Sequence, residues 1–291
     1  MDMRRENEMI PKIIHYCWFG RNELPKETVQ CIESWKKYFP NYIIKECNEY
    51  IFDIKMCSYV EEAYNEKKWA FVSDDARVWI LYNYGGVYFD TDVEVVKPLD
   101  DIVAKGAFMG CEVSYDSKKG KERFSIAPGL GIAAPKGMEI YEEILRYYEK
   151  LHFVEKDGSL NMKTVVSHVT EMLKMRGFDP LKKEIQMVQG ICIYPVEYFC
   201  PINYITGEVA FTENTRTIHH YMSSWRSKQE IKAYKIRQTV SKKCGEQTGI
   251  IVEFICIFPY RLVERIERYG MLGLFKRILK RQLRKYKLKK Q

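Results

Sequence analysis

The chain has 291 residues, of which 46% are hydrophobic and 14% aromatic, and its formal net charge is +8. Residues 261–291 alone carry 12 Lys and Arg and two Glu, so the other 260 residues have a net charge of −2. A near-neutral body excludes a broadly basic nucleic-acid-binding domain, and the apolar content is ample for the core of one large domain or two small ones.

The nine cysteines are scattered, without a CxxC pair or another zinc-type spacing. An odd, scattered set predicts reduced thiols in a cytoplasmic protein rather than a disulfide framework. Residues 1–12 lack the apolar segment of a signal peptide, so none is expected. The apolar run 249–260 contains Glu253 and is too short for a transmembrane helix.

Strands and helices alternate at the start of the chain. Residues 10–19 are rich in branched and aromatic side chains and predict a buried first strand. Residues 25–39 have helical spacing, residues 42–45 predict a second strand, and residues 51–65 predict a second helix. This β-α-β-α order predicts a parallel α/β sheet.

The segment 69–94, WAFVSDDARVWILYNYGGVYFDTDVE, predicts a helix, a glycine turn and a strand. We expect Ser73 or Asp74 to begin the helix, because a side-chain oxygen there accepts from free N–H groups and negative charge suits the helix dipole. Gly85 is expected to end the helix, and residues 87–96 to form the strand.

The rest of the body predicts further alternating elements. Strands are expected at 108–112, 129–134 and 185–195, helices at 138–151 and 164–176, and loops at 115–123 and 197–207. Residues 217–225 are expected to form a short strand that runs into a loop. No repeat or low-complexity linker separates these elements. The sequence therefore predicts one α/β domain over residues 1–235 and a helical extension over residues 236–291.

Asp90 and Asp92 flank Thr91 at the end of the predicted strand. Because strand side chains alternate, both carboxylates project to one side and would repel each other unless a cation lies beside them. A hard divalent ion, Mg²⁺ or Mn²⁺, takes oxygen ligands and keeps open positions for phosphate oxygens. Strand ends are also where α/β sheets place ligands. A solvated strand end is the alternative, since D-x-D triplets also occur by chance.

Three segments carry a resemblance to a known family: IPKIIHYCWFG at 10–20, SDDARVWILYNYGGVYFDTDVE at 73–94 and IHHYMSSW at 218–225. They resemble family 32 glycosyltransferases, which include capsular-polysaccharide and Och-type mannosyl transferases, and are similar to the catalytic domain of the large clostridial glucosylating toxins. The resemblance implies a GT-A-like α/β domain, with a mixed, mostly parallel central sheet flanked by helices, before the C-terminal helical tail.

The resemblance also implies roles for five residues of the central segment. Asp74 and Arg77 would lie against the donor sugar and its phosphates, and their i, i+3 spacing puts both on one helix face. Tyr88 would contact the donor, Asp92 would bind the metal directly, and Asp90 would act on the ribose and the metal's water shell. An exposed ion pair and a packed strand tyrosine are the alternatives for the helix pair and for Tyr88.

The first and last segments imply further contacts. In GT-A enzymes the first strand lies under the nucleotide, so Trp18 would stack on the base, unless it belongs to the core. His219 or His220 would complete the metal site, because neutral imidazole suits Mn²⁺ and strand alternation lets only one point inward. The family pattern H-x-aromatic-x-x-S-W favours His219. Trp225, with Ser224 beside it, would cover the donor pyrophosphate.

The resemblance thus implies a Mn²⁺- or Mg²⁺-dependent retaining glycosyltransferase of cell-surface polysaccharide synthesis. It would transfer a sugar from a nucleotide-sugar donor, with a UDP-sugar favoured, to a saccharide or lipid-linked glycan acceptor. No carboxylate of the sequence is placed as a nucleophile, which fits a front-side route. A nucleotide-sugar hydrolase and a non-catalytic sugar- or membrane-binding protein are the alternatives.

Residues 260–291 predict a basic amphipathic helix. Its apolar residues among the lysines and arginines are Leu272, Phe275, Ile278, Leu279 and Leu283. Such a helix suits an anionic membrane surface, so we expect a cytoplasmic protein that binds the inner face of the cell membrane through this helix. A docked helix and a solvated tail are the alternatives, and a nucleic-acid partner is not expected.

Overall fold

The computed structural model describes residues 9–116, 121–204, 206–222 and 227–288 of the chain. The chain divides into two compact units, residues 1–225 and 226–291. The division predicted after residue 235 falls inside helix α9 (Lys228–Cys244), whereas the two units separate just before this helix.

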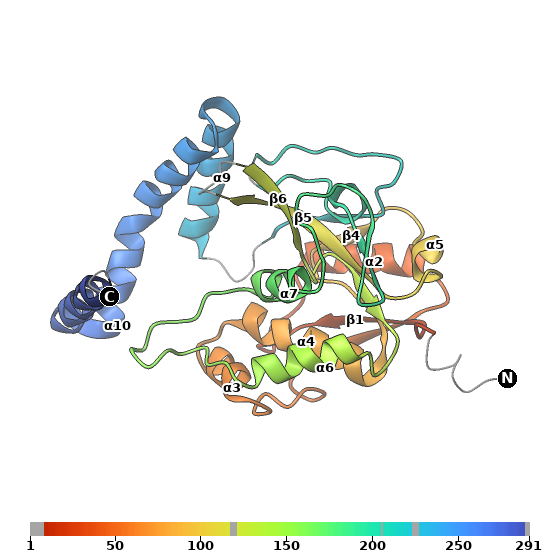
Figure 1. Ribbon diagram of the computed structural model, residues 1–291, viewed down its shortest axis with the longest axis horizontal. Coiled ribbons are helices and arrows are strands. Elements are labelled where there is room, and N and C mark those ends of the chain that lie inside the picture. The colour runs from red at the N-terminus through yellow and green to blue at the C-terminus, as the bar shows by residue number, and fades with distance from the viewer. Residues whose placement is uncertain (1–8, 117–120, 205, 223–226, 289–291) are drawn as a thin grey trace. The chain divides into compact units, whose positions relative to one another are not determined.

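The first unit is built on an eight-stranded sheet (Figure 1). Its strands are β1 (Ile13–Cys17), β2 (Ile43–Cys47), β3 (Gly86–Tyr88), β5 (Phe108–Asp116), β6 (Lys121–Ile126), β7 (Ile132–Ala134), β8 (Gln186–Val188) and β9 (Ile191–Tyr194). Their order is β2-β1-β3-β7-β5-β9-β8, with β6 paired to β5. Strands β2, β1, β3, β5 and β9 share one direction and the others oppose it. The predicted mixed, mostly parallel sheet is confirmed.

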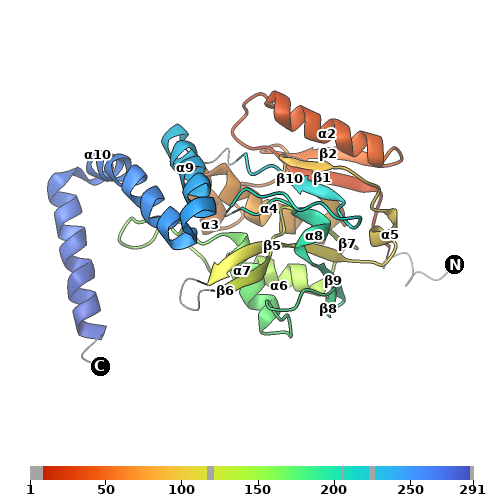
Figure 2. The same ribbon diagram turned by 90° about the horizontal axis from the view of Figure 1, so that it is seen from above.

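Helices cover both faces of this sheet. They are α2 (Lys26–Tyr38), α3 (Ser58–Asn65), α4 (Trp69–Tyr84), α5 (Asp100–Val103), α6 (Glu139–Tyr148), α7 (Val165–Lys174) and α8 (Val196–Phe199). Figure 2 shows α2 on one side of the sheet and α6 and α7 on the other. The predicted α/β class, with a sheet flanked by helices, is therefore confirmed.

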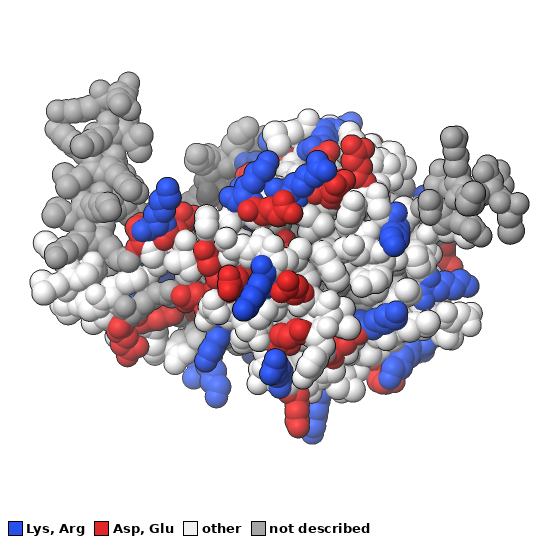
Figure 3. All heavy atoms as spheres, turned by 90° about the horizontal axis from the view of Figure 1, so that it is seen from below, with Lys and Arg blue, Asp and Glu red and all other residues white. Residues whose placement is uncertain are grey.

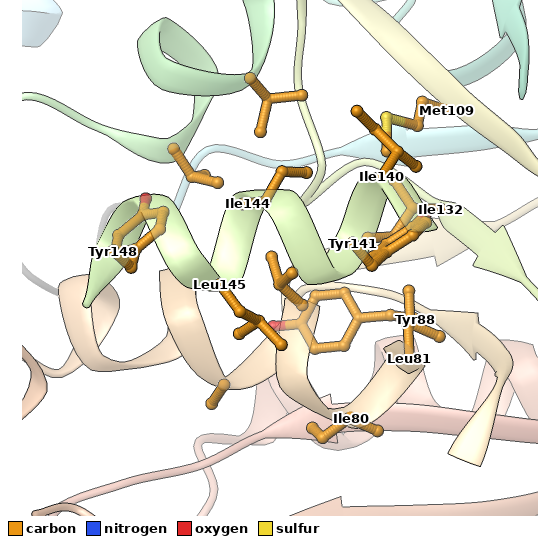
Figure 4. Packing of buried hydrophobic residues seen from close by; sticks show 14 of the residues in the cluster. Ile80, Leu81, Tyr88, Met109, Ile132, Ile140, Tyr141, Ile144, Leu145 and Tyr148 are labelled. Carbon is orange, nitrogen blue, oxygen red and sulfur yellow. The ribbon is translucent and has the colours of Figure 1, made fainter. Parts of the chain in front are cut away.

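Two hydrophobic cores lie on the two faces, because strand side chains alternate. Val87 and Phe108 pack in the core that α2 covers, whereas Tyr88 and Met109 pack in the core that α3, α4, α6 and α7 cover. Figure 4 shows Tyr88 in this second core, together with Leu81 of α4 and residues of α6. The strand β3 is thus fully buried just before the chain reaches Asp90.

Helix α4 begins at Trp69, so the prediction that it starts at Ser73 or Asp74 is wrong. Its N-cap position is Lys68, which makes no side-chain capping bond. Asp74 lies in the second turn and pairs with Arg77 instead of capping free N–H groups. The predicted end at Gly85 is confirmed, because this glycine has a φ of 64° and donates its N–H to Leu81.

The single strand predicted over residues 87–96 is wrong. Strand β3 ends at Tyr88, residues 90–92 form a turn closed by Val93 N–H donating to Asp90 O at 3.0 Å, and β4 (Val93–Val95) follows. Strand β4 leaves the main sheet because it pairs with β10 (Thr217–His219) in a separate two-stranded sheet. We call residues 90–92 the DxD turn.

Other predicted boundaries also change. The polar loop expected at 115–123 is largely a hairpin of β5 and β6, whose pairing reaches Asp116 and Lys121, while residues 117–120 lie outside the described residues. The helix expected at 51–65 begins only at Ser58. The strand expected at 185–195 is the hairpin of β8 and β9, and the loop expected from 197 begins inside α8.

The second unit consists of α9 and α10 (Glu246–Leu288), which confirms the predicted helical extension. Ser227 and Glu230 form a capping box at the start of α9. Gly270, with φ 67° and ψ 162°, interrupts α10. Within the described ranges, every helix is too short or too polar to cross a lipid bilayer.

Charge is mixed over the face of the molecule seen in Figure 3, where Lys and Arg lie among Asp and Glu. This pattern agrees with the near-neutral body predicted from the sequence. All nine cysteines are free thiols, as the sequence predicted.

Candidate functional site

Two segments far apart in the sequence meet at the DxD turn. Strand β10 pairs antiparallel with β4, and its residue His219 lies opposite Val93, next to Asp92. The N–H of His220 donates to the carbonyl of Asp92 at 2.9 Å. The backbone pairing of β4 and β10 therefore carries the late histidine to the two aspartates.

Asp90, Asp92 and His219 form a carboxylate–histidine cluster whose ligand atoms all lie within 4.8 Å of one another. His219 Nε2 lies 3.1 Å from Asp92 Oδ1, and Met222 N–H donates to Asp92 Oδ2 at 3.0 Å. The other ring nitrogen of His219, Nδ1, is buried and has no hydrogen-bond partner. Such an orphaned atom beside two carboxylates is unusual in a folded protein.

The charges of the cluster shift the pKa of its members. Burial acts to raise the pKa of Asp92, but the charge and hydrogen bond of His219, with the Met222 N–H, lower it overall. Burial acts to lower the pKa of His219, but Asp92, then Asp90 and Glu112, raise it to about 8. The protonated imidazole thus balances carboxylate charge at neutral pH in the absence of a metal.

Arg77 joins the helix to the DxD turn. Its NH2 lies 3.1 Å from Asp74 Oδ1, and its NH1 lies 3.2 Å from Asp90 Oδ1. Its Nε donates to the carbonyl of Ser73 at 3.0 Å. The guanidinium therefore bridges two carboxylates with three nitrogens engaged, and the predicted common face of Asp74 and Arg77 is confirmed.

The helix pair is buried rather than exposed: Asp74 is 6% and Arg77 is 4% exposed. Burial raises the pKa of Asp74 to about 6, against the lowering effects of Arg77 and of the Val165 N–H. Burial opposes the charge of Arg77, but Asp90, Tyr88 and Asp74 raise the pKa of the guanidinium overall. The Asp74–Arg77 ion pair is therefore part of the buried fold, and it is also a candidate contact for the sugar donor.

Tyr88 is the last residue of β3, just before the DxD turn, and is only 1% exposed. Its hydroxyl donates to Asp90 Oδ1 at 2.8 Å, and the Arg77 guanidinium lies 5.1 Å from its ring centroid. The ring of Tyr88 is therefore packed in the core, as the alternative interpretation expects, while its hydroxyl reaches the site and orients Asp90.

The other predicted site residues contribute no side chain to the Asp90–Asp92–His219 cluster or fall outside the described residues. His220 Nε2 contacts Glu94 Oε2 at 2.9 Å, because alternation after β10 turns it away from His219. Trp18 packs partly buried against the core under α2, and its Nε1 donates to Asn22 O at 2.7 Å. Ser224 and Trp225 fall outside the described residues.

Sequence reasoning missed three residues at this site. Glu112 of β5 is close enough to Asp90 and His219 to interact electrostatically with both, and burial raises the pKa of its carboxyl overall. The ring of Tyr221 contacts that of His219 in a tilted arrangement, with the two centroids 4.2 Å apart. A Cβ at Gly129 would overlap the Asp90 carboxylate, and Gly129 O accepts from Asp90 N–H at 2.9 Å. Of these three residues, Glu112 could have been found from the sequence, because it ends a predicted strand and α/β sheets bind ligands at strand ends.

The donor set suits a divalent cation. Two carboxylates and an imidazole are the ligands that Mn²⁺ shares with other first-row ions, and carboxylates also suit Mg²⁺. The unpartnered Nδ1 of His219 and the close approach of the Asp90 and Asp92 carboxylates to the imidazole are the features that a bound cation would fit.

Comparisons with known proteins agree with this site. Residues 25–109 match the family described as "Glycosyltransferase sugar-binding region containing DXD motif". Inositol phosphoceramide mannosyltransferase 1 of Schizosaccharomyces pombe is 32% identical over 114 residues, which cover 36% of this chain and 34% of the relative. Subversion of eukaryotic traffic protein A of Legionella pneumophila is 28% identical over 144 residues, covering 38% of this chain and 22% of the relative. The alignments thus span about a third or less of these relatives.

Two solved glycosyltransferase structures are among those similar to this chain. The PaToxG glycosyltransferase is 21% identical with a TM-score of 0.36, covering 49% of this chain and 64% of its own. The galactosyltransferase LgtC, in complex with donor and acceptor sugar analogues, is 12% identical with a TM-score of 0.39, covering 83% of this chain and 95% of its own. The match at residues 25–109 contains the DxD turn, so this part of the chain is similar to the glycosyltransferase sugar-binding region that carries a DXD motif.

Proposed function

We propose that this protein is a divalent-metal-dependent, retaining glycosyltransferase that takes a nucleotide sugar, with a UDP-sugar favoured, as donor. The acceptor is a saccharide or a lipid-linked glycan of cell-surface polysaccharide synthesis. The observation that carries the proposal is the convergence of Asp90, Asp92 and His219 within 4.8 Å, beside the buried Asp74–Arg77 pair. The mannosyltransferase relative supports transfer of a hexose.

In this proposal Asp90, Asp92 and His219 hold Mn²⁺ or Mg²⁺. The bound ion would stabilise the negative charge that develops on the departing diphosphate. Arg77 keeps Asp90 oriented through its bridge to Asp74 and adds positive charge to the same region. The hydroxyl of Tyr88 also orients Asp90, because it donates to Oδ1 of the same carboxylate.

Retention is proposed to follow a front-side route. Glu112 is a further carboxylate that the fold brings near the cluster, so a covalent glycosyl adduct in a double displacement would be expected on this residue. Mass spectrometry of the protein incubated with a 2-fluoro sugar nucleotide should find no adduct, and labelling of Glu112 would contradict the front-side route.

The proposal is tested by a screen of UDP- and GDP-sugars with Mn²⁺. We expect one donor to shift the melting temperature and to be hydrolysed slowly, with faster turnover when a saccharide acceptor is added. An Asp92→Asn variant should lose both responses, whereas Asp53→Asn, a change on an exposed turn, should keep them. Turnover independent of every acceptor would favour a nucleotide-sugar hydrolase, and absence of donor binding would favour a non-catalytic protein.

We also propose that α10 binds an anionic membrane surface, such as the inner face of the cell membrane in a cytoplasmic protein. Its first part exposes an apolar stripe at helical spacing. The stripe consists of Ile251, Phe254, Ile255, Phe258 and Leu262, with exposed fractions of 58%, 59%, 62%, 49% and 38%. Residues 276–290 add nine Lys and Arg and no acidic residue. An apolar face followed by basic residues is typical of interfacial helices.

Vesicle flotation of the full chain tests this membrane proposal. We expect binding to vesicles containing phosphatidylglycerol and little binding to pure phosphatidylcholine. Phe254→Gln with Phe258→Gln should abolish flotation, and Ile43→Gln with Ile51→Gln, two exposed apolar residues of the first unit, should leave it unchanged. Equal flotation of both double variants would refute the role of the stripe.

A further inference from the structure

Tyr221 adopts a backbone conformation that is unfavourable for its residue type. Its φ is 50°, in the left-handed region that bulky L-residues disfavour. Such strain persists only where the surroundings impose it, and it is concentrated at functional sites. Tyr221 directly follows the histidines of the third sequence segment, so the contacts that impose the strain are informative.

The left-handed turn arranges the residues on both sides of Tyr221 around one carboxylate. Before the turn, His219 Nε2 lies 3.1 Å from Asp92 Oδ1; after the turn, Met222 N–H donates to Asp92 Oδ2 at 3.0 Å. The two oxygens of Asp92 are therefore held by a single short segment. An extended residue at position 221 would carry Met222 N–H away from Asp92, because strand geometry separates successive peptide groups.

The side chain of Tyr221 is held from three directions. Its hydroxyl lies 2.9 Å from Cys200 Sγ and 3.4 Å from Glu112 Oε2, and its ring centroid lies 5.0 Å from that of Tyr204. Cys200 follows α8 and Glu112 belongs to β5, so these contacts come from separate elements of the first unit. They fix the phenol ring beside the imidazole of His219.

The fixed ring supports His219. The two ring centroids lie 4.2 Å apart with a tilt of 53°, and Asp92 contacts the imidazole at Nε2. The imidazole is thus held between a carboxylate and a phenol ring, while its Nδ1 has no partner. Residues that orient a metal-ligating histidine change metal affinity typically by about 10- to 100-fold when removed.

We infer that Tyr221 is a positioning residue of the metal site: anchored by Cys200 and Glu112, it holds His219 and the Asp92 carboxylate in the arrangement that binds the cation. This inference rests on the proposed metal-dependent function. It assigns to Tyr221 no contact with the sugar donor and no part in proton transfer.

The test measures Mn²⁺ affinity of the full chain by electron paramagnetic resonance of the free ion, without donor or acceptor. We expect Tyr221→Leu to weaken Mn²⁺ binding by about 10- to 100-fold. Tyr221→Phe keeps the ring and loses the hydroxyl contacts, so we expect a smaller loss, about fivefold. If Tyr221→Phe retains most of the Mn²⁺ affinity that Tyr221→Leu loses, the ring of Tyr221 supports His219.

Tyr147→Leu is the matched control. Tyr147 also contacts a histidine of the first unit, with its hydroxyl 2.9 Å from His168 Nδ1 and ring centroids 5.1 Å apart. Its removal should lower the melting temperature without changing Mn²⁺ affinity. Wild-type Mn²⁺ affinity in a folded Tyr221→Leu variant would overturn the inference.

Two further outcomes are decisive. If Tyr221→Leu does not fold, the Tyr221→Phe variant decides. A Mn²⁺ affinity equal to that of wild type would overturn the anchoring by Cys200 and Glu112, and a weaker Mn²⁺ affinity would support it. If the wild-type chain binds a nucleotide sugar but no Mn²⁺, the metal dependence of the proposed function fails. If the wild-type and Tyr221→Leu chains bind Mn²⁺ equally, the inference about Tyr221 fails instead.

Discussion

Arg77 of α4 and Asp90 of the DxD turn are joined at both carboxylate oxygens: NH1 lies 3.2 Å from Oδ1 and 3.3 Å from Oδ2. Since NH2 also contacts Asp74, one guanidinium ties the buried helix to the turn. The orientation of Asp90 is thus set by α4 together with the Tyr88 hydroxyl of the preceding strand β3. The positive charge of Arg77 offsets the repulsion between the Asp74 and Asp90 carboxylates before any metal ion is bound.

Replacing Arg77 should damage the fold as well as the site. Arg77→Ala leaves Asp74 and Asp90 without their shared cation, and breaking a buried ion pair costs about 3–5 kcal/mol. Urea denaturation should report this loss, and Arg77→Lys should recover little of it because one ammonium cannot serve both carboxylates. Arg146→Ala, which breaks an exposed ion pair on α6, is the control and should cost less than about 1 kcal/mol.

Chelation should remove activity without unfolding the protein. Asp90, Asp92 and His219 are linked to the fold by their own hydrogen bonds, so EDTA is expected to abolish donor turnover while the circular dichroism spectrum stays unchanged. Added Mn²⁺ should restore turnover. Persistent turnover in excess EDTA would contradict metal dependence.

A methyl group at position 129 should displace Asp90. The Cβ of a Gly129→Ala variant would overlap the Asp90 carboxylate and lie 3.0 Å from Arg77 NH1. We expect Mn²⁺ affinity to fall at least about 10-fold, the usual effect of disturbing a ligand's support, measured by isothermal titration calorimetry. Gly273→Ala, where the nearest atom is at 3.5 Å, should retain wild-type affinity. Unchanged binding in both variants would show that Asp90 is not a ligand.

Asp75 should make stability fall as pH rises. It is 1% exposed, its Oδ1 has no partner, and burial, then Glu149 and Asp74, raise its pKa from 3.8 to about 7. A folded-state pKa above the unfolded value means that the folded chain binds the proton more tightly. The contribution of this group to stability is therefore greatest below about pH 4 and is lost progressively up to about pH 7.

The Asp75→Asn variant tests this assignment. An amide cannot ionise, so the variant should lose less stability than wild type between pH 5 and pH 8, by on the order of a few kcal/mol. Chemical denaturation at the two pH values gives the difference. Parallel stability curves for the two proteins would show that Asp75 is not the responsible group.

Local pattern was sufficient for much of the fold. The alternation of strand-type and helix-type segments predicts β1, α2, β2 and the parallel start of the sheet, because apolar periodicity and turn residues are properties of neighbouring residues. The i, i+3 spacing placed Asp74 and Arg77 on one helix face for the same reason. Boundaries were less accurate, as the start of α4 shows, because tertiary packing rather than a capping side chain stabilises its first turn.

The sequence by itself determined the α/β class, the DxD residues and the basic C-terminal segment, since each depends on short-range spacing or composition. Only the tertiary structure decided how the aspartates converge, because the expected strand breaks at Tyr88 and a turn replaces it. It also decided between His219 and His220, and it brought Glu112 and Tyr221 to the cluster. These contacts join residues up to about 130 positions apart through the pairing of β4 with β10, which no local pattern encodes.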